Sequence, residues 1–290
     1  MRTAAMAHQS KEPVTVPETT PTGTAAAAPA MSPRRRRRLG DATFSGIATT
    51  ILVALLAVLC EIGPRAGWWG EEVLPSTSSI VASAADLLGQ PQFWGDAART
   101  SLEIGLSIVF GSVLGLLLGL VFWKLPTVGR IFEPYLVSFY AVPMVLFYPL
   151  AIVVVGINAS SVVILATIMA TIPVALNTTV GLNGIRPVYL KLARSLQCSP
   201  RQLLTSIALP AAAPFIVAGL RLGVVYALIG SIAMEFVTAQ AGLGYRIRYL
   251  YEIFDNQTMF AYIFVVLVVS MILTALLVAV EKLLVKGRTQ

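Results

Sequence analysis

Six long apolar stretches constrain the fold of this chain more than any other feature of its sequence. A helix needs about 20 apolar residues to cross the hydrocarbon core of a bilayer. Only 12% of the 290 residues are charged and 57% are hydrophobic, whereas soluble domains carry about 25% charged residues. The sequence therefore predicts an all-α membrane protein with six transmembrane helices. The expected spans are 44–62, 102–123, 135–156, 160–177, 212–237 and 259–281.

The segment before the first apolar stretch has a different composition. Residues 1–33 are rich in Ala, Thr, Pro and Ser, and Arg34 to Arg38 follow as a run of five arginines. We expect residues 1–40 to be a disordered cytoplasmic tail and residues 41–290 to be one transmembrane domain. A cleaved signal peptide is the alternative, but Leu59-Cys60-Glu61 lacks the small residues that cleavage requires. An uncleaved anchor is the preferred interpretation.

Two of the apolar stretches are expected to form a tight helical hairpin. Only Gly156, Ile157, Asn158 and Ala159 separate 135–156 from 160–177. Three prolines also lie inside the apolar stretches. Such prolines free backbone carbonyls and kink helices, either to serve a moving gate or as simple structural accommodation, and the latter is preferred. These prolines are Pro143, Pro149 and Pro173.

Basic residues are distributed unequally between the two sides that six spans would create. Cytoplasmic loops of membrane proteins carry an excess of Lys and Arg. With the N-terminus inside, the other face holds only four of them, Arg65, Arg99, Arg246 and Arg248. The distribution predicts that both termini are cytoplasmic. The cytoplasmic basic residues are then Arg34–Arg38, Lys124, Arg130, Arg186, Lys191, Arg194, Arg201, Lys282, Lys286 and Arg288.

Several classes of function are disfavoured by what the sequence contains. The net charge of +7 is explained by membrane orientation, so we do not predict nucleic-acid binding. His8 is the single histidine, and Cys60 and Cys198 are placed on opposite sides of the membrane, which disfavours a disulfide and a zinc, haem or iron–sulfur cofactor. We expect no catalytic triad, no ATP-binding Walker loop and no pair of intramembrane carboxylates, and therefore not an enzyme.

A basic polar island lies at residues 184–210 between two apolar stretches, and it reads as two short helices. Pro187 suits the first turn of one helix, and Gln197-Cys198 marks a break. Ser199-Pro200-Arg201-Gln202 then gives a capping-box pattern, and Pro210 is expected to end the second helix. An amphipathic loop lying on the lipid surface and a docking element for a soluble partner are both compatible with this pattern.

Two further patterns concern the inside of the membrane. Gly111, Gly115 and Gly119 stand four apart, a spacing that lets two helices approach closely. Arg221 and Glu235 are ionisable residues within the fifth stretch, and such groups usually face the bundle or water. At about 21 Å apart along one helix they are too distant to pair. Glu235 either borders a solute path or snorkels to the outer interface.

The polar island resembles the cytoplasmic loop of binding-protein-dependent ABC transporter permeases. That signature is Glu-Ala-Ala, three residues, Gly, and then a run to Ile and Leu-Pro. Here Lys191-Leu192-Ala193-Arg194-Ser195-Leu196-Gln197 occupies the first part and Ile207-Ala208-Leu209-Pro210 the last. The chain departs from the signature twice, because Lys191 replaces the acidic residue and Gln197 replaces the glycine.

Other elements resemble the nitrate, sulfonate, taurine and bicarbonate subfamily of these permeases in the same order. They are the Leu-Pro-Ser element within 73–80, the entry to a span at 214–222, Ala233-Met234-Glu235-Phe236, and Gly242-Leu243-Gly244-Tyr245. The resemblance covers about residues 74–281. It implies the type I ABC importer permease fold, with six transmembrane helices and a cytoplasmic coupling-helix loop.

The resemblance also implies a function and partners. It implies a permease in the bacterial cytoplasmic membrane that forms the path for a small solute, with an oxyanion or organic sulfonate favoured. ATP hydrolysis would occur in separate cytoplasmic ATPase subunits, a second permease copy would complete the pore, and an extracytoplasmic solute-binding protein would deliver the solute. A secondary transporter or channel that needs no ATPase is the main alternative, and a membrane enzyme is a weaker one.

We assign candidate site residues on this basis. Tyr140, Met144 and Glu235 are expected on the substrate pathway, and Gly111, Gly115 and Gly119 in helix packing. The residues expected to couple the loop to an ATPase are Lys191, Leu192, Ala193, Arg194, Ser195, Gln197, Ser199, Pro200 and Pro210.

Overall fold

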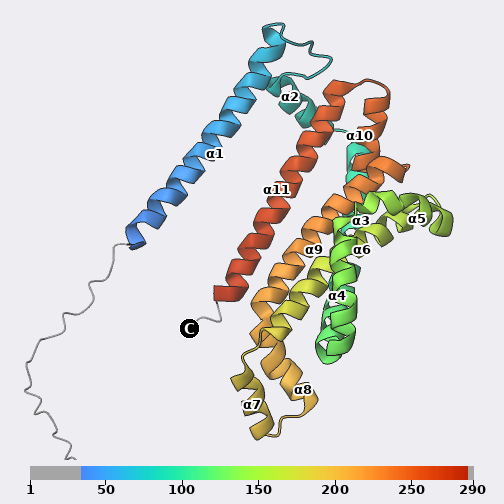
Figure 1. Cartoon of the computed structure of the whole chain (residues 1–290). Helices are drawn as coiled ribbons and strands as arrows, with labels where there is room; N and C mark the ends of the chain where they lie inside the picture. The colour runs from blue at the N-terminus through green and yellow to red at the C-terminus, as the bar shows by residue number, and fades with distance from the viewer. Residues whose placement is uncertain (1–33, 287–290) are drawn as a thin grey trace, which may run out of the picture. The chain divides into compact units, whose positions relative to one another are not determined.

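The computed structural model describes the backbone of residues 34–286 and the side chains of residues 47–279, and this part of the chain is helical (Figure 1). The chain divides into two units, residues 1–52 and 53–290, and all of the packing below lies within the second. The helices are α1 (Arg34–Arg65), α2 (Thr77–Leu88), α3 (Pro91–Lys124), α4 (Pro126–Ala141), η1 (Met144–Phe147), α5 (Tyr148–Val155), α6 (Ala159–Asn183), α7 (Pro187–Ser195), α8 (Pro200–Gln202), η2 (Leu203–Ala208), α9 (Leu209–Thr238), α10 (Leu243–Glu252) and α11 (Asn256–Lys286).

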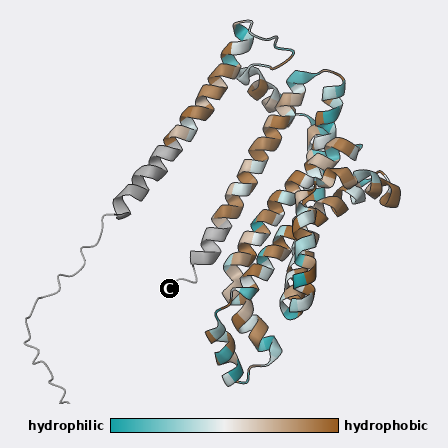
Figure 2. Ribbon diagram, in the orientation of Figure 1, coloured by the Kyte–Doolittle hydropathy of each residue, from teal (hydrophilic) through white to brown (hydrophobic). Residues whose placement is uncertain are grey.

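Residues 1–33 of the expected tail lie outside the described residues. Helix α1 begins at Arg34, so the arginine run is helical and the first helix starts ten residues before the predicted span. Five stretches are long and apolar enough to cross a membrane within the described part of the chain, and Figure 2 shows their hydrophobic colouring. They are Ile47–Arg65, Pro91–Lys124, Ala159–Asn183, Pro200–Thr238 and Asn256–Ala279.

The third predicted span is broken, which corrects the expectation of one continuous helix over 135–156. Helix α4 ends at Ala141, and the chain bends by 95° before η1 and α5. Pro143 explains the break, because proline has no N–H to continue the helical hydrogen bonds and pushes the residue before it out of the helical region. Val142 is accordingly extended, with a ψ of 130°. The broken pair counts as a sixth span only if both helices are taken together.

Helix α6 is the centre of the bundle and packs against α3 on one side and α9 on the other. Gly111, Gly115 and Gly119 of α3 lie directly on α6. A Cβ atom added at Gly115 would come within 2.5 Å of the Cβ of Val174 and 2.7 Å of the Thr171 carbonyl oxygen. The absence of side chains on this face of α3 therefore sets how closely the two helices approach.

The hairpin between α5 and α6 closes through local capping. Gly156 has a φ of 87°, a conformation that residues with a Cβ rarely adopt. Asn158 follows as the N-cap of α6, and its side-chain oxygen accepts from the backbone N–H groups of Ser160 and Ser161. Gly156 and Asn158 together thus fix where helix α6 begins.

The second loop helix does not end at Pro210, contrary to the expectation from sequence. The chain passes from α8 through η2, a π-helical turn, into α9, and Leu209 N–H bonds to the Leu204 carbonyl five residues earlier. A π-turn inserts one extra residue into a helix. Pro210 lies in the first turn of α9, directly after this widened turn. Its missing N–H is accommodated at that position, so the loop continues into the membrane-spanning helix α9.

Two shorter helices, which lie outside the predicted spans, cover the opposite end of the bundle. Helix α2 and helix α10 bury apolar residues against α11, where Leu87, Leu250 and Tyr262 belong to one core cluster. Phe93 at the start of α3 joins the same cluster. This packing anchors the loop between α9 and α10, which carries the polar residues described next.

Candidate functional site

The polar loop 184–210 is a rigid projection whose conformation is set by two capping motifs. Helix α7 ends in a Schellman motif, in which Cys198 N–H bonds to the Ala193 carbonyl and Gln197 N–H to the Arg194 carbonyl. Gln197 occupies the left-handed position of that motif, with a φ of 51°. This is the residue that replaces the glycine of the resembling signature, and the backbone there is one that glycine adopts without strain.

The second capping motif starts α8, and the structure contains the capping box that the sequence predicts. The Ser199 side chain accepts from Gln202 N–H at 3.3 Å, and the Gln202 side chain accepts from Ser199 N–H at 2.8 Å. Pro200 fills the first helical position. The turn between α7 and α8 is therefore fixed by the Schellman motif at the end of α7 and by the capping box at the start of α8.

Ala193 is the buried position of α7. It is only 3% exposed, and α7 packs against η2, so a small residue fits where the helix meets the rest of the chain. The other residues predicted to couple the loop to an ATPase are exposed, and they are Lys191, Leu192, Arg194, Ser195, Gln197, Ser199, Pro200 and Pro210.

The outward face of α7 is apolar. Val188 is 69% exposed, Leu192 52% and Leu196 67%, and residues four apart share one face of a helix. Tyr189 adds an exposed ring beside them. An exposed apolar stripe on a rigid polar projection is typical of a protein contact surface. Figure 2 shows this mixture of hydrophobic and hydrophilic residues on α7.

A cavity of about 200 Å³ lies at the break between α4 and η1. Tyr140 and Met144, both predicted on the substrate pathway, line it. The Tyr140 ring lies 4.9 Å from the ring of Tyr226 on α9, tilted by 52°. The complete lining is Tyr140, Ala141, Val142, Pro143, Met144, Met169, Ile172 and Tyr226.

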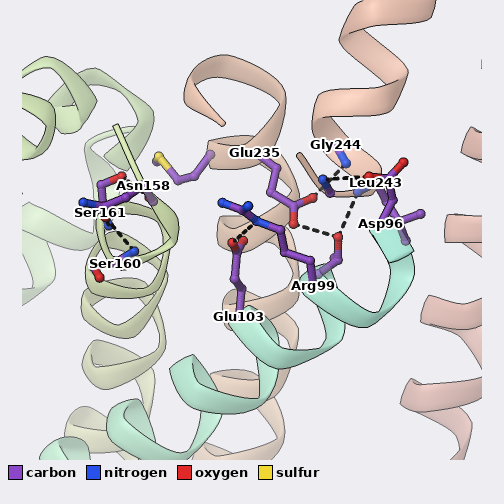
Figure 3. A network of polar contacts seen from close by, with 12 residues as sticks. Asp96, Arg99, Glu103, Asn158, Ser160, Ser161, Glu235, Leu243 and Gly244 are labelled. Carbon is purple, nitrogen blue, oxygen red and sulfur yellow. Dashed lines mark hydrogen bonds and ion pairs between the residues drawn. The ribbon is translucent and has the colours of Figure 1, made fainter. Parts of the chain in front are cut away.

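Glu235 lies in a buried polar junction away from this cavity (Figure 3). Its side chain is fully buried, so neither a snorkelling position nor an open path describes it. Glu235 Oε1 accepts from the Thr100 hydroxyl at 2.7 Å, and Oε2 accepts from Gly244 N–H at 2.8 Å. Thr100 Oγ1 in turn accepts from Leu243 N–H at 2.9 Å. These bonds tie α3, α9 and the start of α10 together.

An ion pair extends the same junction. Arg246 Nε donates to Asp96 Oδ2 at 2.9 Å, and Gly242 N–H donates to Asp96 Oδ1 at 3.2 Å. Arg246 also lies over the rings of Tyr245 and Tyr249. The sequence placed Arg246 among the outer basic residues but gave it no partner. Its carboxylate partner comes from α3, 150 positions earlier in the chain.

Two buried carboxyl groups meet beside the junction, contrary to the expectation of no intramembrane carboxylate pair. Glu103 and Glu235 are both fully buried and lie near each other (Figure 3), and Arg99 Nε donates to Glu103 Oε1 at 3.1 Å. Glu103 Oε2 has no hydrogen-bond partner among the described residues. An acidic residue inside the apolar stretch 102–123 was the available signal, since such residues are costly in lipid.

The chain was compared with known families and proteins. A family model described as "Binding-protein-dependent transport system inner membrane component" matches residues 111–286. The formylaminopyrimidine transport permease protein ThiX of Halalkalibacterium halodurans is 28% identical over 85% of this chain and 98% of its own length. The putative aliphatic sulfonates transport permease protein SsuC of Bacillus subtilis is 25% identical over 87% of this chain and 92% of its own.

Further similarity extends to another curated relative and to solved structures. The taurine transport system permease protein TauC of Escherichia coli is 26% identical over 80% of this chain and 88% of its own length. A chain in an inward-facing structure of the MetNI methionine ABC transporter superposes with a TM-score of 0.59 at 21% identity, over 69% of this chain and 99% of that chain. At that identity the likeness shows a shared fold.

The family match covers more than half of the chain and includes α6, the 184–210 loop, α9 and α10. The whole-length similarity to three transport permeases and the fold shared with an ABC importer agree with it. On this basis, the chain belongs to the binding-protein-dependent transport system inner membrane component family and is a permease of the ABC importer type.

Proposed function

We propose that this permease forms the translocation pathway of an ABC importer and receives the work of ATP hydrolysis through α7. In this proposal two copies of the chain form the pathway, and cytoplasmic ATPase subunits dock on their loops. An extracytoplasmic solute-binding protein delivers the solute, as the name of the family implies. The chain lies in the bacterial cytoplasmic membrane with both termini on the cytoplasmic side.

The exposed apolar face of α7 is the observation that carries this proposal. Val188, Leu192 and Leu196 are exposed in the isolated chain, and moving one such side chain out of water into an interface contributes about 1.5–3 kcal/mol. The flanking residues Lys191 and Arg194 are exposed and suit the rim of an interface. The two capping motifs hold α7 in one orientation as a projection. A helix lying on the lipid surface does not require its orientation to be fixed in this way.

The path from this surface to the membrane is continuous. Helix α7 packs against η2, and α8, η2 and α9 form one 39-residue helical stretch, Pro200–Thr238. A displacement of α7 therefore moves the inner end of α9 without an intervening flexible linker. ATP drives such a change only if the ATPase contacts two states of the permease differently, and the docked loop is the contact that would differ.

Substitution on the apolar face tests the proposal. The tagged chain is purified from membranes of its own host, and co-purifying ATPase subunits are quantified by mass spectrometry. We expect Leu192→Asp to reduce the recovered ATPase at least about tenfold, since an unpaired charge at an interface core costs well over 1.4 kcal/mol. Ser206→Asp places the same charge at an exposed site on η2 and serves as the matched control.

Two outcomes would contradict the proposal. Equal ATPase recovery with Leu192→Asp and wild type would remove α7 from the docking surface. Solute flux through the purified chain alone in liposomes, without ATPase or ATP, would favour a secondary transporter or channel.

The orientation of the loop is tested separately. A Ser199→Cys variant, made in a background with Cys198→Ser, places an exposed thiol at the tip of the loop. We expect this thiol to resist an impermeant maleimide in intact cells and to react after the membrane is opened. Labelling from outside would reverse the proposed topology, even if the ATPase result held.

Two classes of solute are candidates for this permease. The resemblance favours a small oxyanion or sulfonate, and two of the relatives above are named for aliphatic sulfonates and taurine. A third is named for formylaminopyrimidine, a nitrogen heterocycle. The choice between an anion and a heterocycle depends on the chemistry of the pathway itself.

A further inference from the structure

The cavity at the helix break is lined by residues from the middle parts of two long apolar helices, α6 and α9. Met169 and Ile172 stand near the middle of the 25-residue helix α6, and Tyr226 near the middle of the 30-residue helix α9. Irregular backbone at membrane depth is tolerated only where it is buried in protein or lines a cavity. Broken helices near the midplane are also a recurring way to build solute sites in transporters.

The backbone at this break supplies hydrogen-bond acceptors. A helix leaves its last four carbonyl groups without partners of its own, and the end of α4 at Ala141 borders the cavity. One of these carbonyls, that of Phe139, accepts from Val142 N–H. Pro143 has no N–H to offer to any of them. The C-terminal end of a helix also carries a partial negative charge, which repels an anion.

The side chains around the cavity add aromatic and polarisable surface. Tyr140 and Tyr226 form a tilted ring pair with their ring centroids 4.9 Å apart. Met144 and Met169 add thioether groups, which contact aromatic rings favourably. No residue of the lining carries a formal charge.

We propose that this cavity is a transit site that selects uncharged planar nitrogen heterocycles bearing an N–H donor, the aminopyrimidine class, over oxyanions and sulfonates. The inference rests on the proposed function, because a transit site presupposes that the chain forms a path for a solute. A sulfonate entering the cavity would give up its hydration without a cation or a backbone N–H cluster in return, which is strongly unfavourable. An aminopyrimidine stacks on the tyrosines and donates to the α4 carbonyls.

The size of the cavity agrees with one substituted ring. A cavity of about 150 Å³ in another protein holds benzene, and this one is about 200 Å³. The remaining volume accommodates one or two small substituents on a six-membered ring, which limits the class to monocyclic solutes.

The experiment compares two probes with six-membered rings, one of which is uncharged and the other an anion. The permease is purified with its co-purifying ATPase and without a solute-binding protein, which would impose its own selectivity. Binding of 4-aminopyrimidine and of benzenesulfonate is measured by saturation-transfer NMR. We expect 4-aminopyrimidine to bind at least about tenfold more tightly. Tyr226→Leu is expected to weaken its binding about two- to tenfold through loss of ring stacking, and Tyr226→Phe less.

Tyr135→Leu is the matched control, because Tyr135 is an exposed tyrosine of α4 that lies outside this cavity. It is expected to leave 4-aminopyrimidine binding unchanged. Benzenesulfonate binding as tight as 4-aminopyrimidine, or equal loss from Tyr135→Leu and Tyr226→Leu, would overturn the proposal. Loss of ATPase co-purification in wild type would instead contradict the proposed function, so the two failures are distinguishable.

Discussion

The two ends of this bundle treat polar residues in opposite ways. At one end, the 184–210 loop exposes its charged residues and an apolar stripe, and its shape depends on bonds between residues three to five positions apart. At the other, Thr100 and Glu235 bond across 135 positions of sequence, and both side chains are buried. The first, open end presents an exposed apolar surface, whereas the second, closed end encloses its polar groups within the bundle.

Under the proposed function, this difference corresponds to separate tasks within one transport cycle. The loop would keep its shape without a partner, and local capping is suited to that. The other end would hold α3, α9 and α10 in register while the loop is moved. Buried, fully bonded polar groups are suited to this because each is expensive to leave unpaired. Glu235, expected on a solute path, belongs with this second group.

The largest expected effect comes from breaking the ion pair at the closed end. Asp96→Ala leaves Arg246 without its carboxylate and Gly242 N–H without its acceptor. Removing one partner of a buried pair costs about 3–5 kcal/mol. We expect about 3 kcal/mol here, because Arg246 keeps its contact with the Tyr249 ring. Thermal unfolding of the detergent-purified protein measures the loss, and an unchanged melting temperature would show that the pair does not hold this end.

A smaller loss is expected from the central hydroxyl of the junction. Thr100→Val keeps the shape of the side chain but removes a donor to Glu235 and an acceptor for Leu243 N–H. Leaving buried groups unpaired costs about 1–3 kcal/mol, so we expect about 2 kcal/mol in the same measurement. Thr178→Val is the matched control, since Thr178 is fully buried and its hydroxyl has no partner among the described residues. Equal effects of both substitutions would mean that the junction bonds contribute nothing.

The same contrast explains what could be predicted from sequence. The capping box at Ser199 and the break at Gln197 follow from neighbouring residues, and the structure contains both. The break at Pro143 was also readable, but the apolar residues around it favoured a continuous span. The pairing of Asp96 with Arg246 follows only from the packing of α3 against α9 and α10. No local pattern in either residue's neighbourhood specifies its partner.

Helix packing between the two ends is expected to respond to one methyl group. Gly115→Ala places a Cβ 2.5 Å from the Val174 Cβ and 2.7 Å from a backbone carbonyl oxygen of α6. Overpacking of this kind costs about 1–3 kcal/mol, and we expect about 1.5 kcal/mol. Gly105→Ala on the same helix meets nothing within 4 Å and should be neutral or stabilising, as alanine is the better helix former. A loss with Gly105→Ala equal to that with Gly115→Ala would contradict close packing as the cause.

The smallest expected effect is a gain at the open end. Gln197 holds a φ of 51° in the Schellman turn that ends α7, and a residue with a Cβ pays about 1 kcal/mol for that conformation. Gln197→Gly should therefore stabilise the turn by about 1 kcal/mol, and slower hydrogen exchange at the Leu196, Gln197 and Cys198 amides would report it. Gln197→Ala keeps the Cβ and should leave exchange unchanged. Because the turn is local, neither change should alter the melting temperature as the Asp96 and Thr100 substitutions do. Faster exchange in Gln197→Gly would mean that the glutamine side chain, rather than the backbone geometry, holds the loop in shape.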